Sequence, residues 1–109
     1  MPSNKDENTL TATAGGTADT LATITDAGNY VLYVDTTNMA LGDIVTLEVQ
    51  VKPRSTGTTR NVFKGVYAHV QDDPIKASIP ISVVNEGKFI LTQEAGTARN
   101  FDWAIVDMS

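Results

Sequence analysis

The segment Asp43–Pro53 (DIVTLEVQVKP) constrains the fold of this chain more than any other. Four apolar residues alternate in it with four polar ones: Val45, Leu47, Val49 and Val51 against Thr46, Glu48, Gln50 and Lys52. This period of two is typical of a half-buried β-strand and does not fit an amphipathic helix. Pro53 ends the strand because it has no N–H group to donate to a ladder. We predict a central strand whose apolar face enters the core, while its polar face meets water or a neighbouring subunit.

Short segments rich in β-branched and aromatic residues predict further strands, separated by turns containing Gly, Pro, Asn and Asp. These segments are Thr9–Ala14, Thr17–Thr25, Asn29–Asp35, Arg60–Gln71, Ala77–Val84, Lys88–Glu94 and Arg99–Met108. In the last of them, Phe101, Trp103 and Ile105 share one face. For Asn29–Asp35, the pattern leaves open whether Tyr30, Leu32 and Val34 or Val31 and Tyr33 face inward.

Turn residues predict how some of these strands connect. We expect Thr17–Thr25 and Asn29–Asp35 to form a hairpin through the intervening Asp-Ala-Gly-Asn turn, and Arg60–Gln71 to pair back onto the central strand. Thr36–Gly42 is predicted to form a single helical turn that ends at its glycine. Two residues mark irregular pairing: Pro80 predicts an edge strand or a bulge, and Gly65 predicts a bulge.

The predicted fold class is all-β, because no stretch of about ten residues has a clean helical period. We expect an antiparallel β-sandwich of about eight strands, jelly-roll-like, with a seven-stranded immunoglobulin-like sandwich as the alternative. Residues 1–8 (MPSNKDEN) are polar and without periodicity, which predicts a flexible N-terminal arm. Residues 9–109 are predicted to form one β-sandwich domain.

Charge and composition argue against several classes of partner. The formal net charge is −5 and the pI is about 4.5, whereas nucleic-acid binding depends on basic side chains that neutralise phosphates. The chain has no cysteine, so disulfides and thiolate metal sites are excluded. No apolar run is long enough for a membrane-spanning helix. We therefore expect neither nucleic acid nor membrane as a partner.

A search for catalytic and metal-binding patterns finds none that is specific. His69 is the only histidine, and no GxSxG motif supplies a nucleophile for a triad. Asp72 and Asp73 lack the spaced oxygen ligands of a calcium loop, and turn formation explains them more simply. We predict that the protein is not an enzyme and has no catalytic residues, cofactor or metal. A small hydrolase has only dispersed carboxylates in its favour.

Aromatic and apolar residues instead suggest binding surfaces. Five aromatic residues suit core packing or a protein interface, and a carbohydrate platform is the alternative: Tyr30, Tyr33, Phe63, Tyr67 and Trp103. The strand Arg60–Gln71 has apolar residues on both faces, so one face is expected to pack the core and the other to meet a partner. The predicted subunit or capsid interface comprises Phe63, Tyr67, His69 and Arg60.

Three stretches together resemble a known family: Thr17–Lys52 (beginning TADTLATITDAGNYVLYVD), Val66–Lys76 (VYAHVQDDPIK) and Leu91–Val106 (LTQEAGTARNFDWAIV). The pattern is similar to small virion proteins of tailed bacteriophages, in particular capsid decoration (cement) proteins of jelly-roll type. The resemblance supplies no catalytic or cofactor residues.

The resemblance implies a protein made in the host bacterial cytoplasm and located on the capsid surface of the virion. Its expected function is to bind the outer surface of the head and stabilise the shell. The expected partners are the major capsid protein and further copies of the chain, as a homo-oligomer with a trimer as the first expectation. The alternative is a tail or baseplate accessory protein that acts as a carbohydrate- or receptor-binding module.

Overall fold

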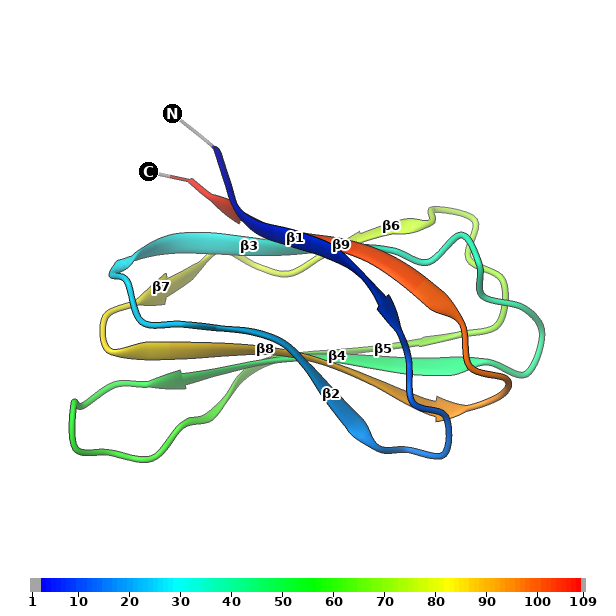
Figure 1. Cartoon of the computed structure of the whole chain (residues 1–109), viewed down its shortest axis with the longest axis horizontal. Helices are drawn as coiled ribbons and strands as arrows, with labels where there is room; N and C mark the ends of the chain where they lie inside the picture. The colour runs from blue at the N-terminus through cyan, green and yellow to red at the C-terminus, as the bar shows by residue number, and fades with distance from the viewer. Residues whose placement is uncertain (1–2, 109) are drawn as a thin grey trace.

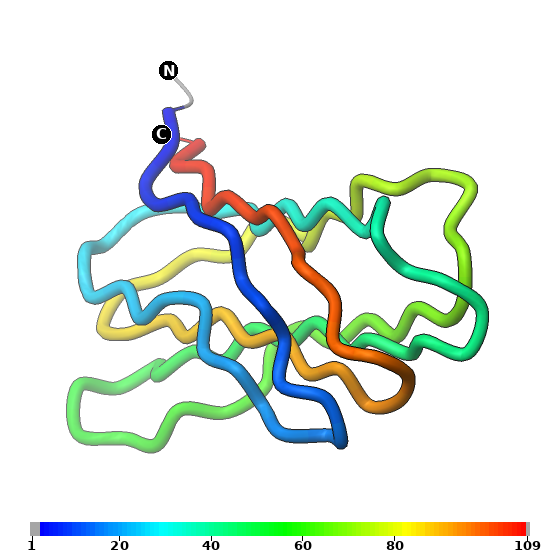
Figure 2. Tube along the Cα trace, turned by 45° about the vertical axis from the view of Figure 1, so that its right-hand side comes forward, coloured from blue at the N-terminus to red at the C-terminus, as the bar shows by residue number. Residues whose placement is uncertain are grey.

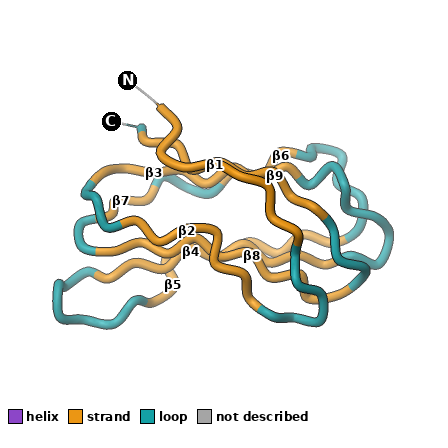
Figure 3. Tube along the Cα trace, in the orientation of Figure 1, coloured by secondary structure: helices purple, strands orange, loops and turns teal. Residues whose placement is uncertain are grey.

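The computed structural model describes residues 3–108 and consists of two antiparallel β-sheets packed face to face (Figures 1 and 3). The first sheet has the order β1-β9-β3-β6, with β7 also paired to β3, and the second has the order β2-β8-β4-β5. The strands are β1 (Ser3–Thr11), β2 (Ala18–Ile24), β3 (Gly28–Asp35), β4 (Ile44–Lys52), β5 (Arg60–Ala68), β6 (Ile75–Ala77), β7 (Ile81–Val83), β8 (Glu86–Ala95) and β9 (Asn100–Asp107). The predicted all-β sandwich is confirmed.

Strand β4 lies between β8 and β5, as expected for a central strand. Val45, Leu47 and Val49 are buried, and Val51 packs partly buried against the core. On the opposite face, Thr46 is also buried within the chain, although the polar face was expected to meet water or a neighbouring subunit. It lies between Thr92 of β8 and Val66 of β5 in the ladder, so neighbouring side chains cover it.

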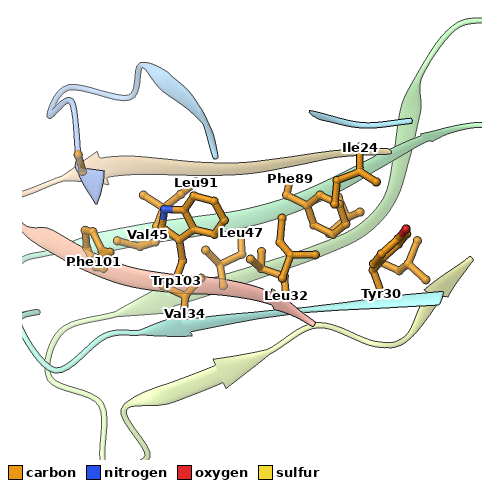
Figure 4. Close-up of a cluster of buried hydrophobic side chains, with 14 of the residues drawn as sticks. Ile24, Tyr30, Leu32, Val34, Val45, Leu47, Phe89, Leu91, Phe101 and Trp103 are labelled. Atoms are coloured by element: carbon orange, nitrogen blue, oxygen red, sulfur yellow. The ribbon is translucent and has the colours of Figure 1, made fainter. Parts of the chain in front are cut away.

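The core fills the space between the two sheets (Figure 4). Phe89 and Leu91 of β8 join the apolar row of β4 from the second sheet. The first sheet contributes the predicted row of β9 and the row of β3 whose orientation was open: Phe101, Trp103 and Ile105, with Tyr30, Leu32 and Val34. The inward face of β3 is therefore the one that carries Tyr30.

The hairpin predicted between β2 and β3 is wrong. β2 pairs with β8 in one sheet and β3 pairs with β9 in the other, so the chain crosses between layers at this turn. The Tyr30 hydroxyl donates a hydrogen bond of 2.9 Å to the carbonyl of Asp26 and fixes this corner. A Cβ at Gly28 would lie 2.9 Å from the same hydroxyl, so glycine makes room for the ring.

The N-terminal segment also differs from the expectation of a flexible arm. Ser3–Thr11 forms β1, which pairs antiparallel with β9, and the two run side by side in Figure 2. Backbone pairing requires no apolar pattern, which is why periodicity did not indicate this strand. The Thr11 hydroxyl adds a 2.7 Å bond to Oδ1 of Asn100 on β9. Met1 and Pro2 lie outside the described residues.

Three smaller features refine the sequence predictions. Thr36–Gly42 contains two separate turns in place of a helical turn, and Gly42 has a φ of 94°. The strand expected at Ala77–Val84 is interrupted near Pro80, so β6 and β7 both pair with β3 at the sheet edge, as the proline indicated. The bulge of β5 lies at Val62, where the register shifts, rather than at Gly65.

Candidate interaction surfaces

Two of the four residues predicted to form an interface, Phe63 and Tyr67, face the interior of the sandwich. They lie opposite Val49 and Val45 of β4 and pack partly buried against the core. The Tyr67 ring folds over Gly65, where a Cβ would lie 2.8 Å from the hydroxyl. The outward face of β5 therefore carries Val62, Lys64 and Val66, and alternation alone could not distinguish these two apolar faces.

The third predicted residue, Arg60, is exposed and is the first residue of β5, directly after the loop of the β4–β5 hairpin. It lines a hollow of about 340 Å³ together with Val51, Pro53, Arg54, Gly57, Thr58, Asn61 and Val62. The Asn85 side chain donates hydrogen bonds of 3.1 and 3.0 Å to the carbonyls of Lys52 and Pro53. These bonds anchor the base of the hairpin. We call Arg54 and Arg60, with the apolar residues beside them, the hairpin surface.

The fourth residue, His69, follows the other end of β5 and has a φ of 64°. Its backbone N–H donates to the carbonyl of Asp43 at 2.7 Å, and its Nδ1 accepts from the N–H of Gly42 at 2.9 Å. His69 therefore fastens the loop before β4. The structure does not bring the four residues together: two face inward and the others lie at opposite ends of one strand.

A buried polar cluster, missed in the sequence analysis, lies at the end of the core near this loop. Asp43 is 1% exposed, and its Oδ2 accepts hydrogen bonds from Nε of Arg99 at 2.8 Å and from the N–H of Ala40 at 2.9 Å. Gln93 is fully buried; its side chain accepts from the N–H of Arg99 and donates to the carbonyls of Ala95 and Thr97. These hydrogen bonds join the loop before β4 to the loop between β8 and β9.

The environment of Asp43 controls its ionisation. Burial raises the pKa of this carboxyl, but the bond from Arg99, the backbone N–H of Ala40, the charge of Arg99 and the N–H of Thr97 together outweigh it. The pKa of Asp43 therefore lies below its ordinary value, and the side chain is an ionised structural group at neutral pH.

The outer face of the first sheet carries a second hollow, of about 280 Å³. Tyr33 and Ile75 are exposed apolar residues that line it with Trp103 and Ala104. Three carboxylates complete the lining, one each from β1, β3 and β9: Glu7, Asp35 and Asp102. We call the six side chains other than Trp103 the acidic face: Glu7, Tyr33, Asp35, Ile75, Asp102 and Ala104.

The five aromatic residues considered as a carbohydrate platform do not share one surface. Tyr30 and Trp103 are buried in the core, and Trp103 is only 8% exposed. Phe63 and Tyr67 pack from the second sheet, while Tyr33 lies on the outer face of the first. Among residues 3–108, no group of three or more His, Cys, Asp or Glu side chains is arranged to hold a metal ion. The same residues include no helix long and apolar enough to cross a membrane.

Comparison with known proteins gives a likeness in fold. No protein-family profile matches the chain, and no curated protein matches it significantly. A chain from the structure of infectious bursal disease virus, Gx strain, matches with a TM-score of 0.53 and 14% sequence identity. The match covers 97% of this chain and 31% of the viral chain, so this chain spans about a third of that neighbour. At this identity, the likeness shows a shared sandwich architecture.

Proposed function

We propose that the protein is a structural component of a virus particle, specifically a capsid decoration (cement) protein of a tailed bacteriophage. The observation that carries the proposal is a pair of exposed apolar surfaces on opposite layers of the sandwich. Val62 and Val66 are 46% and 58% exposed on the second sheet, and Ile75 is 55% exposed on the first. A protein that links neighbouring shell subunits needs two such surfaces on a rigid scaffold, and apolar patches commonly mark interaction sites.

Two further findings support the proposal. The fold likeness is to a chain taken from a virus structure, and it extends over nearly the whole of this chain. The chain also resembles phage decoration proteins in the three stretches described above. The proposed partner is the major capsid protein, and the proposed location is the outer surface of the head, after synthesis in the host bacterial cytoplasm.

The mechanism is stabilisation by preferential binding. A protein that binds the assembled shell and not its dissociated subunits stabilises the shell by mass action, about 2.7 kcal/mol per site at a free concentration of 100 Kd. No bond is made or broken, so the side chains need only be complementary to the shell surface.

The test mixes the purified protein with undecorated capsids of the phage that encodes it. Co-sedimentation should show saturable binding, and decorated capsids should disassemble at a higher temperature than bare ones. Val66→Asp should weaken binding because it places a charge on an exposed apolar surface, whereas Thr17→Asp, in an exposed loop, is the matched control. Absence of binding to the capsid would refute the proposal.

One observation favours the alternative, a tail or baseplate module that binds carbohydrate. Tyr33 is 37% exposed beside the carboxylates of Asp35 and Asp102, and an aromatic ring with acceptor groups suits a sugar. Glycan-array binding that disappears in Tyr33→Ala would support it. Tyr33 is the suitable residue for this test because Trp103 belongs to the core, where truncation would destabilise the fold.

A further inference from the structure

We infer that the hairpin surface of one copy binds the acidic face of a second copy, so that the chain assembles head to tail through opposite charges. The two surfaces are Arg54 and Arg60 on the β4–β5 hairpin, and Glu7, Asp35 and Asp102 on the first sheet. The inference concerns the isolated protein and does not rest on capsid binding.

The arginines of the hairpin surface are available for such a contact. Both side chains are exposed, and the ion pairs within residues 3–108 involve other cations, namely Lys5, Lys52, Lys88 and Arg99. Val51, Pro53 and Val62 line the hollow beside them. A guanidinium fork can bind a carboxylate through two parallel hydrogen bonds, and the apolar neighbours add surface that gains from leaving water.

The acidic face carries an electrostatic cost that such a contact would relieve. Asp35 of β3 lies directly opposite Asp102 of β9 in the ladder, and Cβ atoms of such pairs are roughly 4.5–5.5 Å apart. Like charges at this position destabilise a sheet. Thr37 donates to Oδ1 of Asp35 and Thr9 to Oδ1 of Asp102, which orients both carboxylates. None of the ion pairs within the described part of the chain involves the carboxylates of this face.

The positions of the two surfaces determine the type of assembly. The β4–β5 hairpin projects from one end of the longest axis, while β6, which supplies Ile75, lies toward the other end (Figures 1 and 2). The molecule extends 40 Å along that axis and the two surfaces belong to different sheets, so they do not meet within one chain. A contact between two different surfaces is heterologous and produces a ring when the rotation closes. A three-membered ring would give the trimer expected from the resemblance.

The proposed contact predicts how self-association depends on salt concentration. The net charge of −5 makes copies repel one another overall, so attraction must come from the local juxtaposition of arginine and carboxylate. Exposed charge pairs are screened over about 8 Å at an ionic strength of 0.15 M. Self-association should therefore weaken as sodium chloride is added, unlike an interface built only from apolar side chains.

The test is a charge swap followed by sedimentation equilibrium and native mass spectrometry at low salt. Arg54→Glu with Arg60→Glu reverses the hairpin surface, and Asp35→Lys with Asp102→Lys reverses the acidic face. Each pair should weaken self-association by about tenfold or more, because like charges then face each other. The chain that carries all four substitutions keeps the net charge of −5 and should recover self-association, since its surfaces are again complementary.

Matched controls are Lys64→Glu and Glu94→Lys, which reverse exposed charges outside both surfaces and should leave association unchanged. Thermal melts verify that each variant is folded. A wild-type chain that stays monomeric at low salt overturns the inference, as do reversed pairs that associate normally. Failure of the fourfold variant to recover also overturns it, and would indicate separate partners for the two surfaces. Capsid co-sedimentation is measured separately, so the self-association proposal and the capsid-binding proposal can each be refuted without the other.

Discussion

At the residue scale, the cluster of the buried Asp43 and Gln93 with the partly exposed Arg99 places a charged group at the end of the core. A buried carboxylate is costly unless it is paired and hydrogen-bonded, and Asp43 accepts hydrogen bonds from the Arg99 guanidinium and from the backbone N–H of Ala40. The sequence contains a signal for this cluster. In the alternation of each strand, these residues continue the inward-facing row: Asp43 continues the row of β4, Gln93 continues the row of β8, and Arg99 continues the row of β9. Polar residues that continue an inward-facing row at one end of three strands predict a buried polar contact.

Replacement of Gly96 should be the most damaging glycine substitution at this cluster. An added Cβ would lie 2.0 Å from Oδ1 of Asp43 and 2.9 Å from its Cα, at a φ of 95°. Gly15 has a similar φ of 92° with nothing within 4 Å, so Gly15→Ala measures the backbone strain alone. We expect about 1 kcal/mol for Gly15→Ala and about 2–4 kcal/mol for Gly96→Ala in urea denaturation. Equal losses would mean that Asp43 does not pack against Gly96.

Stability should decrease in acid because of Asp43. Its pKa is lower in the folded chain than in the unfolded chain, so the unfolded state takes up a proton first as the pH falls. The stabilisation is fully present above the unfolded pKa of about 3.9 and is lost as the pH falls through the lower folded value. Urea denaturation between pH 7 and pH 2 should show this loss, and Asp43→Asn should have a flatter profile below pH 4. Parallel profiles would exclude Asp43 as the source.

At the element scale, the sequence predicted where most strands lie, but it predicted only some of the strand pairs. Alternation identified β4 with its inward face, and it placed Phe101, Trp103 and Ile105 of β9 on the one face that enters the core. The turn before β3 signalled a reversal of the chain, but local turn chemistry does not specify whether the chain stays in the sheet or crosses to the other layer. The hairpin of β4 and β5 stayed in one sheet, whereas β2 and β3 separated.

The edges of both sheets are irregular. The register shifts at Lys5 in β1, at Leu21 in β2 and at Val62 in β5, and the fourth edge is interrupted between β6 and β7. Bulges and interruptions disfavour the addition of a further strand, which is how natural sheets avoid edge-to-edge aggregation. Contacts through sheet faces and the hairpin tip, as proposed above, therefore suit this molecule better than extension of a sheet.

Removal of residues 3–8 tests whether β1 belongs to the folded sheet. The deletion removes the ladder bonds that residues 3–8 make to β9 and leaves the Trp103–Asp107 part of β9 as a free edge, so we expect a loss of about 0.5–1.5 kcal/mol for each bond. Urea denaturation measures the loss, and light scattering should reveal aggregation through the uncovered edge. The control Glu7→Ala keeps the backbone pairing and should remain within about 0.5 kcal/mol. Unchanged stability on deletion would support a flexible arm.

At the scale of the whole molecule, the strand order brings together residues that are far apart in the sequence, so the surfaces that they form cannot be read from sequence patterns. Glu7, Asp35 and Asp102 come from three strands that are far apart in the sequence and become neighbours only through the order β1-β9-β3. Among the residues predicted to form an interface, Arg60 is exposed because it follows the hairpin, while Phe63 and Tyr67 turn inward with β4 as their neighbour. Function in such a scaffold depends on the arrangement of faces, which the sequence specifies only through the complete fold.

Because one core joins both sheets, the molecule should unfold in a single transition. Leu47→Ala truncates a side chain of the second sheet that is 1% exposed, at an expected cost of about 2–5 kcal/mol. Trp103, the only tryptophan, is in the first sheet and packs in the same core, so its fluorescence reports unfolding across the interface between layers. The midpoint measured by Trp103 fluorescence should fall by the same amount as the midpoint measured by circular dichroism.

The control is Glu48→Ala, on the outer face of β4, which should change the free energy of unfolding measured by either method by no more than about 0.5 kcal/mol. A fluorescence midpoint that does not follow the circular dichroism midpoint in Leu47→Ala would mean that the two sheets unfold separately.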